Sequence, residues 1–160
     1  MSRAFISIKS NIGNPSAQVL QALADIGSIP NSELLACSSL YWSAPFGNGN
    51  QPCFINAVAE IETALLPYTL LSILHQIELV HGGVGNLENG PRILGLDLLL
   101  YDDLVLKDEK LTLPHPRIHE RAFMLIPLIE ISPNCRIPGY DLAAHCLANC
   151  SGQKVGLFEG

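Results

Sequence analysis

The sequence predicts a single α+β domain, a sandwich of ferredoxin-like character in which helices cover a mainly antiparallel sheet. Segments with strand and helix periodicity follow one another in the order β-α-β-β-α-β, and two of the strands are consecutive, as in a hairpin. The chain has 160 residues, a length that suits one domain, residues 1–160, with a substantial core. Its hydrophobic fraction of 48% indicates a folded globule.

Strands are recognised by alternation of apolar residues or by short apolar runs between turn residues. The expected strands cover residues 4–9, 33–42, 53–63 and 92–103. In the third strand Phe54, Asn56 and Val58 share one face, because successive strand residues point to opposite sides. Residues 104–115 are expected to form a short hairpin partner that leads into a loop.

Helices are expected where apolar residues recur at helical spacing. The expected helices cover residues 13–27, 66–82, 120–131 and 140–150. Asn14 is placed to cap the first helix, and Pro15 stands at its first helical position. Gly27 and Gly82 end the first and second helices, and the third is expected to form in spite of Pro127.

Charge and hydropathy exclude several classes of protein. A net charge of −6 lacks the basic footprint of general nucleic-acid binding, and no stretch approaches the roughly 20 apolar residues of a membrane span. The first residues, "MSRAFISIKSN", lack the apolar run and cleavage site of a signal peptide. We therefore expect a cytoplasmic protein that binds neither nucleic acid nor membranes; the sequence identifies no protein partner.

The five cysteines follow no disulfide-framework spacing. Cys146 and Cys150 lie four residues apart on the last expected helix, next to His145, and could form half a metal site. No second ligand pair stands at zinc-finger spacing. Buried, reduced thiols are therefore the favoured interpretation.

Phe54 and Asn56 share a strand face next to a turn, residues 43–52, that is rich in proline, glycine and asparagine. An aromatic ring and a fixed amide beside such a turn can bind a flat heteroaromatic ring by stacking and hydrogen bonding. The alternative is an ordinary core strand with one satisfied asparagine. Composition alone favours that alternative.

The segment "LPHPRIHERAF", residues 113–123, carries the only dense group of basic side chains in this acidic chain. They are His115, Arg117, His119 and Arg121. Arginine offers a rigid fork of donors, which suits an anionic ligand such as a phosphate chain. A solvated surface loop is an equally good interpretation of the segment alone.

Asp97 lies within the apolar run "LDLLLY". Removing a carboxylate from water is costly unless a partner or a metal ion binds it. Arg92 begins the same segment, and for these two residues function is the favoured interpretation. Glu78, late in the second helix, could reach a ligand or cap its neighbours.

Together, five segments resemble the hydroxymethyl-dihydropterin pyrophosphokinase family of folate biosynthesis, in the family's order: "FISIKSNIG", "SSLYWSAPFG", "QPCFINAV", "GPRILGLDLLLY" and "LTLPHPRIHERAFMLIPLIEISP". The resemblance runs over nearly the whole chain, and the last segment is highly specific. It implies the ferredoxin-like fold and transfer of the β,γ-pyrophosphoryl group of ATP to 6-hydroxymethyl-7,8-dihydropterin. Two Mg²⁺ ions take part in the family's reaction, and AMP is released.

The resemblance also implies roles for individual residues. Phe54 and Phe123 would sandwich the pterin, while Ser43, Phe46 and Asn56 would hydrogen-bond it. The residues facing ATP would be Glu78, Arg92, Thr112, His115 and Arg121. Of these, Arg92, His115 and Arg121 would be catalytic, and Asp97 would hold Mg²⁺.

The chain departs from the family pattern around the metal ions and the nucleotide. The family has an Asp-x-Asp pair where this chain has Gly95-Leu96-Asp97, and a glycine where it has Lys9. The loop "HGGVGNLENGPR" also lacks the family's arginines and tryptophan. Since losing one transition-state cation contact commonly costs ~10²–10³ in rate, the alternative is a divergent paralogue that binds pterin but is catalytically weak or inactive. Asp97 is then the remaining half of a magnesium-binding pair, and Gly95→Asp is expected to raise metal-dependent nucleotide binding.

Overall fold

A six-stranded antiparallel sheet forms the centre of the molecule, in a computed structural model that describes residues 1–45, 51–82 and 93–160. The strand order is β5-β1-β4-β3-β8, and β2 pairs with β4 outside this path. The strands are β1 (Ser2–Ser10), β2 (Ser32–Cys37), β3 (Tyr41–Ser43), β4 (Phe54–Thr63), β5 (Gly95–Tyr101) and β8 (Val155–Leu157). A separate two-stranded hairpin joins β6 (Leu106–Lys107) to β7 (Thr112–Leu113). The predicted α+β class and antiparallel sheet are confirmed.

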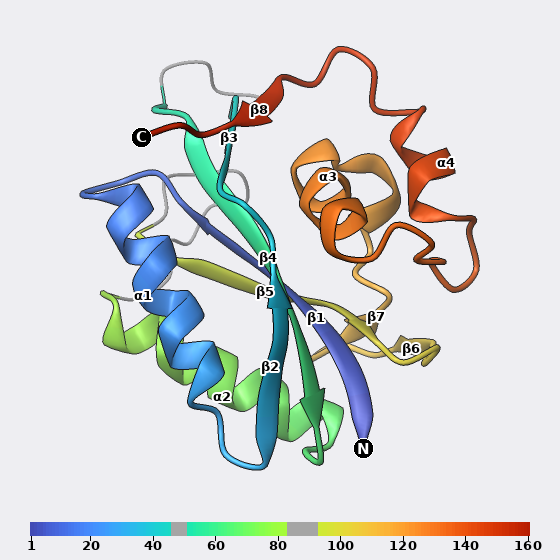
Figure 1. The fold of residues 1–160 in the computed structure, drawn as a ribbon. Helices are drawn as coiled ribbons and strands as arrows, with labels where there is room; N and C mark the ends of the chain where they lie inside the picture. The colour runs from blue at the N-terminus through green and yellow to red at the C-terminus, as the bar shows by residue number, and fades with distance from the viewer. Residues whose placement is uncertain (46–50, 83–92) are drawn as a thin grey trace.

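Helices cover both faces of this sheet, as Figure 1 shows. The helices α1 (Pro15–Gly27) and α2 (Pro67–Val80) lie on one face, and α3 (Ala122–Ile131) and α4 (Ala143–Leu147) lie on the other. Alternate residues of each strand supply the two cores, so that Ile6 and Ile8 pack toward α1 while Phe5 and Val58 pack toward α3. Odd-numbered residues of β1 and even-numbered residues of β4 therefore face α3.

The predicted helix starts and stops hold at α1. The side-chain oxygen of Asn14 accepts a hydrogen bond from the backbone N–H of Ala17 at 3.4 Å, and Pro15 is the first helical residue. Helix α3 forms with Pro127 inside it. No helix in residues 1–45, 51–82 and 93–160 is long and apolar enough to cross a membrane.

The single strand predicted for residues 33–42 is wrong, because the chain forms two strands, β2 and β3, with a break between them. At the break, the hydroxyl of Ser38 accepts the backbone N–H of Val58 at 2.9 Å. The backbone N–H of Ser39 is turned out of the sheet and donates to the carboxylate of Glu130 on α3, at 3.0 and 3.1 Å. Side-chain partners thus replace part of the regular ladder at this point, while the backbone N–H of Ser38 still donates to the carbonyl of Val58 at 2.9 Å.

The C-terminal region also differs from the prediction. The helix expected for residues 140–150 is shorter, Ala143–Leu147, because Ala148, Asn149 and Cys150 continue in tighter turns with bonds to the third preceding residue. The strand β8 was not predicted. The strand β5 ends at Tyr101, and Asp102 follows in a left-handed conformation with φ of 48°.

Candidate active site

Three neighbouring strands place the predicted site residues in two rows on the sheet face toward α3. In one row Asn56 of β4, Lys9 of β1 and Gly95 of β5 are direct partners. In the adjacent row Ser7 of β1 pairs with Val58 on one side and Asp97 on the other. Since directly paired residues point to the same face, Asp97 projects toward the face that carries Asn56 and Lys9.

An aromatic slot lies beside the first row, bounded by Phe54 of β4 and Phe123 of α3. Its lining residues are Lys9, Ser43, Ala44, Phe54, Asn56, Arg121 and Phe123. The ammonium of Lys9 lies 5.4 Å from the ring centroids of both phenylalanines, and the guanidinium carbon of Arg121 lies 5.9 Å from that of Phe123. Only about 10 Å³ remains free. Four of the five predicted pterin residues are therefore together; the fifth, Phe46, lies outside the described residues.

The amide of Asn56 is fixed at the base of the aromatic slot. Its side chain is fully buried, and its nitrogen donates to the hydroxyl of Ser43 at 2.8 Å and to the backbone carbonyl of Tyr41 at 3.3 Å. The amide oxygen is buried without a hydrogen-bond partner among the described residues. An unpaired buried acceptor is costly, so this oxygen is suited to accept an N–H from a ligand.

A second hollow, the Asp97–His115 cleft, lies over β5 and between α2 and the β6–β7 hairpin. It has a volume of about 250 Å³, and Asp97, Thr112 and His115 line it together with Leu71 and residues 108–111, among others. A larger hollow of about 850 Å³ shares its α2 and hairpin residues and extends to Tyr68 and Ser72. Three residues predicted to face ATP or metal are thus brought together.

His115 presents a hydrogen-bond donor to this cleft. The backbone N–H of Arg117 donates to its Nδ1 at 3.1 Å, which leaves the ring proton on Nε2, 4.0 Å from a carboxylate oxygen of Asp97. Burial lowers the pKa of His115, the Asp97 carboxylate opposes the shift, and among the cations Lys9 contributes most to the lowering. The imidazole is therefore neutral at pH 7, with Nε2–H directed at the cleft.

Glu78, which was also predicted to face ATP, has a different position. Glu78 is buried, 4% exposed, and its carboxylate accepts the backbone N–H of Leu96 at 2.8 Å. It therefore ties α2 to β5 at the residue next to Asp97, instead of lining the Asp97–His115 cleft. Arg92 lies outside the described residues.

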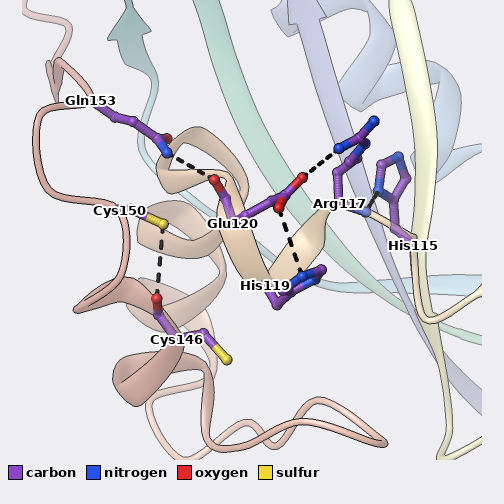
Figure 2. A network of polar contacts seen from close by, with 7 residues as sticks. All are labelled: His115, Arg117, His119, Glu120, Cys146, Cys150 and Gln153. Atoms are coloured by element: carbon purple, nitrogen blue, oxygen red, sulfur yellow. Dashed lines mark hydrogen bonds and ion pairs between the residues drawn. The ribbon is translucent and has the colours of Figure 1, made fainter.

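The basic segment does not form one patch. Arg117 donates to the carboxylate of Glu120 at 2.7 Å, and Nε2 of His119 lies 3.8 Å from the same carboxylate. Figure 2 shows Glu120 between these two basic side chains. The ring of His119 also stacks on Tyr140, with centroids 4.1 Å apart. His115 and Arg121 therefore line the candidate site, while Arg117 and His119 bind their own neighbours.

Comparison with known proteins decides the family. The family model described as 7,8-dihydro-6-hydroxymethylpterin-pyrophosphokinase (HPPK) matches residues 5–133. The chain belongs to the HPPK family. A Pseudomonas aeruginosa protein named 2-amino-4-hydroxy-6-hydroxymethyldihydropteridine pyrophosphokinase is 39% identical over 158 residues, covering 99% of this chain and 98% of that protein. A Haemophilus influenzae protein of the same name is 37% identical, with 97% of each covered.

Among solved structures, wild-type Plasmodium falciparum HPPK-DHPS has a similar fold, with a TM-score of 0.70 at 12% identity. The match covers 92% of this chain and 44% of that chain, so this HPPK-family chain spans less than half of the larger protein. At this identity the match supports the fold. The predicted family and fold are both confirmed.

The metal site expected of the HPPK family fits one ion better than two. Asp97 is 35% exposed at its side chain and faces the Asp97–His115 cleft. A single Mg²⁺ is commonly held by one or two carboxylates together with substrate phosphates and water, so Asp97 fits it. A second ion would lack a direct carboxylate ligand on this strand, because Gly95, which shares the face of Asp97, has no side chain.

The cysteines agree with the simpler interpretation. Cys146 and Cys150 are both buried and free of disulfide bonds, and the thiol of Cys150 lies 3.8 Å from the backbone carbonyl of Cys146. They lie under α3, in the core shared with Leu125 and Ile137. Their role is packing.

Lys9 is the site residue that sequence reasoning missed. Its departure from the family glycine was noted, but no role followed from it, since a lysine near a strand end is usually solvated. The signal that could have revealed it is parity: Lys9 has the parity of Phe5 and Ser7, which are buried on the α3 face.

Proposed function

We propose that this HPPK-family chain transfers the pyrophosphoryl group of ATP to 6-hydroxymethyl-7,8-dihydropterin, giving the pterin diphosphate and AMP. One observation carries the proposal: Asn56 and Lys9 of the aromatic slot and Asp97 of the carboxylate–imidazole cleft project from one sheet face, in adjacent rows of the same strands. The full-length relatives with the enzyme's name support it. Its ATP requirement makes the cytoplasm the expected compartment.

The aromatic slot suits the pterin ring. Phe54 and Phe123 offer two ring faces for stacking. The unpaired oxygen of Asn56 can accept a ring N–H, and the Ser43 hydroxyl, 2.8 Å from the nitrogen of the same amide, can hydrogen-bond the same edge of the ring. A contact from Phe46 remains a prediction. This side of the site would bind and orient the hydroxymethyl group.

The Asp97–His115 cleft suits the phosphate chain. Neutral His115 would donate from Nε2 to a phosphate oxygen, Arg121 would add a cationic donor from the slot side, and Thr112 lines the cleft. A Mg²⁺ ion held by Asp97 would neutralise charge on the phosphates. The hydroxyl oxygen of the pterin would bond to the β-phosphorus and release its proton to solvent water, while the bond from that phosphorus to the oxygen of AMP breaks. Contacts from Arg92 and Glu78 remain predictions.

The test is AMP formation from ATP and the reduced pterin across a range of Mg²⁺ concentrations. The unmodified protein should turn over, and Asp97→Asn should lower kcat by about 10²-fold. Asp103→Asn is the matched control, because Asp103 is an exposed acid in the turn after the same strand. Pterin binding without AMP release would instead identify the catalytically inactive paralogue.

A further inference from the structure

Lys9 occupies the place that the aromatic slot would give to a flat ring. Its ammonium lies 5.4 Å from the centroids of both Phe54 and Phe123, and about 10 Å³ of the slot is free. Pockets that take ring-sized ligands have volumes of roughly 300 Å³ or more. A bicyclic ring therefore cannot stack between these phenylalanines until the lysine side chain leaves.

The strand register defines where the Lys9 side chain can go. Its direct partners are Asn56 on β4 and Gly95 on β5. Its diagonal neighbours on the same face are Phe54 in one direction and Asp97 in the other. Diagonal neighbours lie about 7–8 Å apart, within reach of a long side chain. From an unchanged backbone, the ammonium can therefore reach either the slot or the Asp97–His115 cleft.

Among the described residues that line the Asp97–His115 cleft, Lys110 of the hairpin is the one lysine or arginine, and the acids Asp97, Asp108 and Glu109 line it as well. Gly95 stands beside Lys9 without a side chain, and Asp97 offers the one carboxylate of the Gly95-Leu96-Asp97 segment. A polyphosphate chain bound there carries several negative charges. The residues of the cleft suit one metal ion, and not two, to neutralise them. An ammonium that arrives from Lys9 would supply a further fixed positive charge.

We propose that Lys9 couples the two halves of the site: its ammonium fills the aromatic slot when the pterin is absent and moves to contact the phosphates of ATP when the pterin enters. This inference rests on the proposed function. Lys9 is then a substrate-binding residue, and its ammonium supplies at the phosphates positive charge that a second metal ion would otherwise supply. It also predicts that each substrate increases affinity for the other, because coupling between two sites is reciprocal.

The experiment measures this coupling without turnover. The affinity for 6-hydroxymethylpterin is measured by fluorescence with and without α,β-methylene-ATP and Mg²⁺, and the affinity for the nucleotide with and without the pterin. In the unmodified protein each ligand should increase affinity for the other about tenfold, the scale expected for one desolvated cation contact.

Three variants at position 9 separate blocking from charge. Lys9→Ala opens the slot, so the pterin alone should bind about tenfold more tightly, and the coupling should disappear. Lys9→Met keeps the length without the charge, so pterin binding should stay weak and the coupling should again be lost. Lys9→Arg keeps the charge and should retain coupling. Lys107→Met, an exposed lysine on the hairpin, is the control.

Two results would overturn the inference in distinguishable ways. If Lys9→Ala and Lys9→Met bind both ligands with unchanged affinity and unchanged coupling, Lys9 has no such role, while the proposed function stands. If neither the unmodified protein nor Lys9→Ala binds 6-hydroxymethylpterin at all, the proposed function fails and the coupling fails with it.

Discussion

At the scale of single residues, Asn56 has an amide whose two ends are in different states. The nitrogen is bound to Ser43 and Tyr41, and the oxygen has no partner within the described residues. We expect Asn56→Leu to weaken pterin binding by about 10- to 100-fold. In the variant a ring N–H of the pterin would face an apolar side chain in place of the amide oxygen that accepts it in the unmodified protein. Titration of 6-hydroxymethylpterin by fluorescence measures the change.

Ser38→Ala is the matched control for this variant. The Ser38 hydroxyl bonds the backbone N–H of Val58, one row along β4 from Asn56, but it does not line the aromatic slot. The Ser38→Ala substitution should lower the free energy of unfolding by about 1 kcal/mol and leave pterin affinity unchanged. Equal losses of pterin binding in the two variants would show that Asn56 acts only through the stability of β4.

Tyr41 gives a pH dependence of stability. Burial, followed by the hydrogen bond of 2.5 Å to Glu130, raises the pKa of Tyr41 from 10.0 to about 12. The unfolded chain therefore ionises first as the pH rises, so the stability that Tyr41 contributes is complete below pH 10 and is lost between about pH 10 and 12. Urea unfolding should show Tyr41→Phe less stable than the unmodified chain at pH 8, with the difference shrinking by pH 11.5. A constant difference would contradict the assignment.

Period-two alternation was sufficient to place Phe54 and Asn56 on one face of β4, and the family resemblance added Ser43 and Phe123. All four line the slot. Glu78 was predicted to face the nucleotide, yet it binds the backbone of Leu96. One-dimensional patterns do not tell whether a helical carboxylate meets a ligand or a neighbouring strand, because that depends on how α2 packs on β5.

At the scale of elements, the pairing of β1 with β5 changes the expectation for Gly95. Because Lys9 is the direct partner of Gly95, an aspartate introduced alone at position 95 would pair with the lysine as well as with a metal ion. We expect Gly95→Asp to raise Mg²⁺-dependent affinity for α,β-methylene-ATP about threefold, and Lys9→Gly/Gly95→Asp to raise it about tenfold. Calorimetric titrations across Mg²⁺ concentrations measure both.

Gly95→Asn controls for size in this series, since it adds a side chain of similar shape without the charge. It should leave the Mg²⁺ dependence as it is in the unmodified protein. If the double variant also gave the unmodified Mg²⁺ dependence, Asp97 would not be the remaining half of a carboxylate pair.

Elements were predictable where local signals define them. The Asn14 cap and Pro15 placed the start of α1 correctly. Residues 104–115 were expected as one hairpin partner of the preceding strand, but the segment pairs with itself, β6 with β7. The break between β2 and β3 depends on Glu130, 91 residues away in sequence from Ser39. Three-residue β8 exists because it pairs with β3. Neither has a local signal.

At the scale of the whole molecule, the site depends on contacts between distant parts of the chain. The aromatic slot combines β1, β3, β4 and α3, and the Asp97–His115 cleft combines α2, β5 and the hairpin. The sequence identified strands and helices, but strand order and register decide which side chains share a row. The position of Lys9 between Phe54 and Asp97 is a property of that register.

The C-terminal strand β8 supports the wall of the slot that carries Ser43. Ser43 pairs with Val155, and the backbone N–H of Ala44 donates to the carbonyl of Lys154 at 3.0 Å. Trp42 of β3 is the direct partner of Gly156 in β8. A Cβ added at Gly156 would come within 2.8–2.9 Å of the indole ring of Trp42. Glycine is therefore required for β8 to pair closely with β3, and Figure 1 shows the two strands side by side at the sheet edge.

Gly156→Ala should therefore loosen β8 and affect one half of the site only. We expect the melting temperature to fall by about 3 °C and pterin affinity to fall about threefold. The fluorescence emission of Trp42, which is the one tryptophan of the chain, should also change. Nucleotide affinity in the absence of pterin should stay constant, because the Asp97–His115 cleft is built on β5, at the opposite end of the strand order. Gly27→Ala is the control, since its Cβ would make ordinary contacts with Leu34. Unchanged emission and pterin affinity in Gly156→Ala would mean that β8 does not hold Ser43 in position.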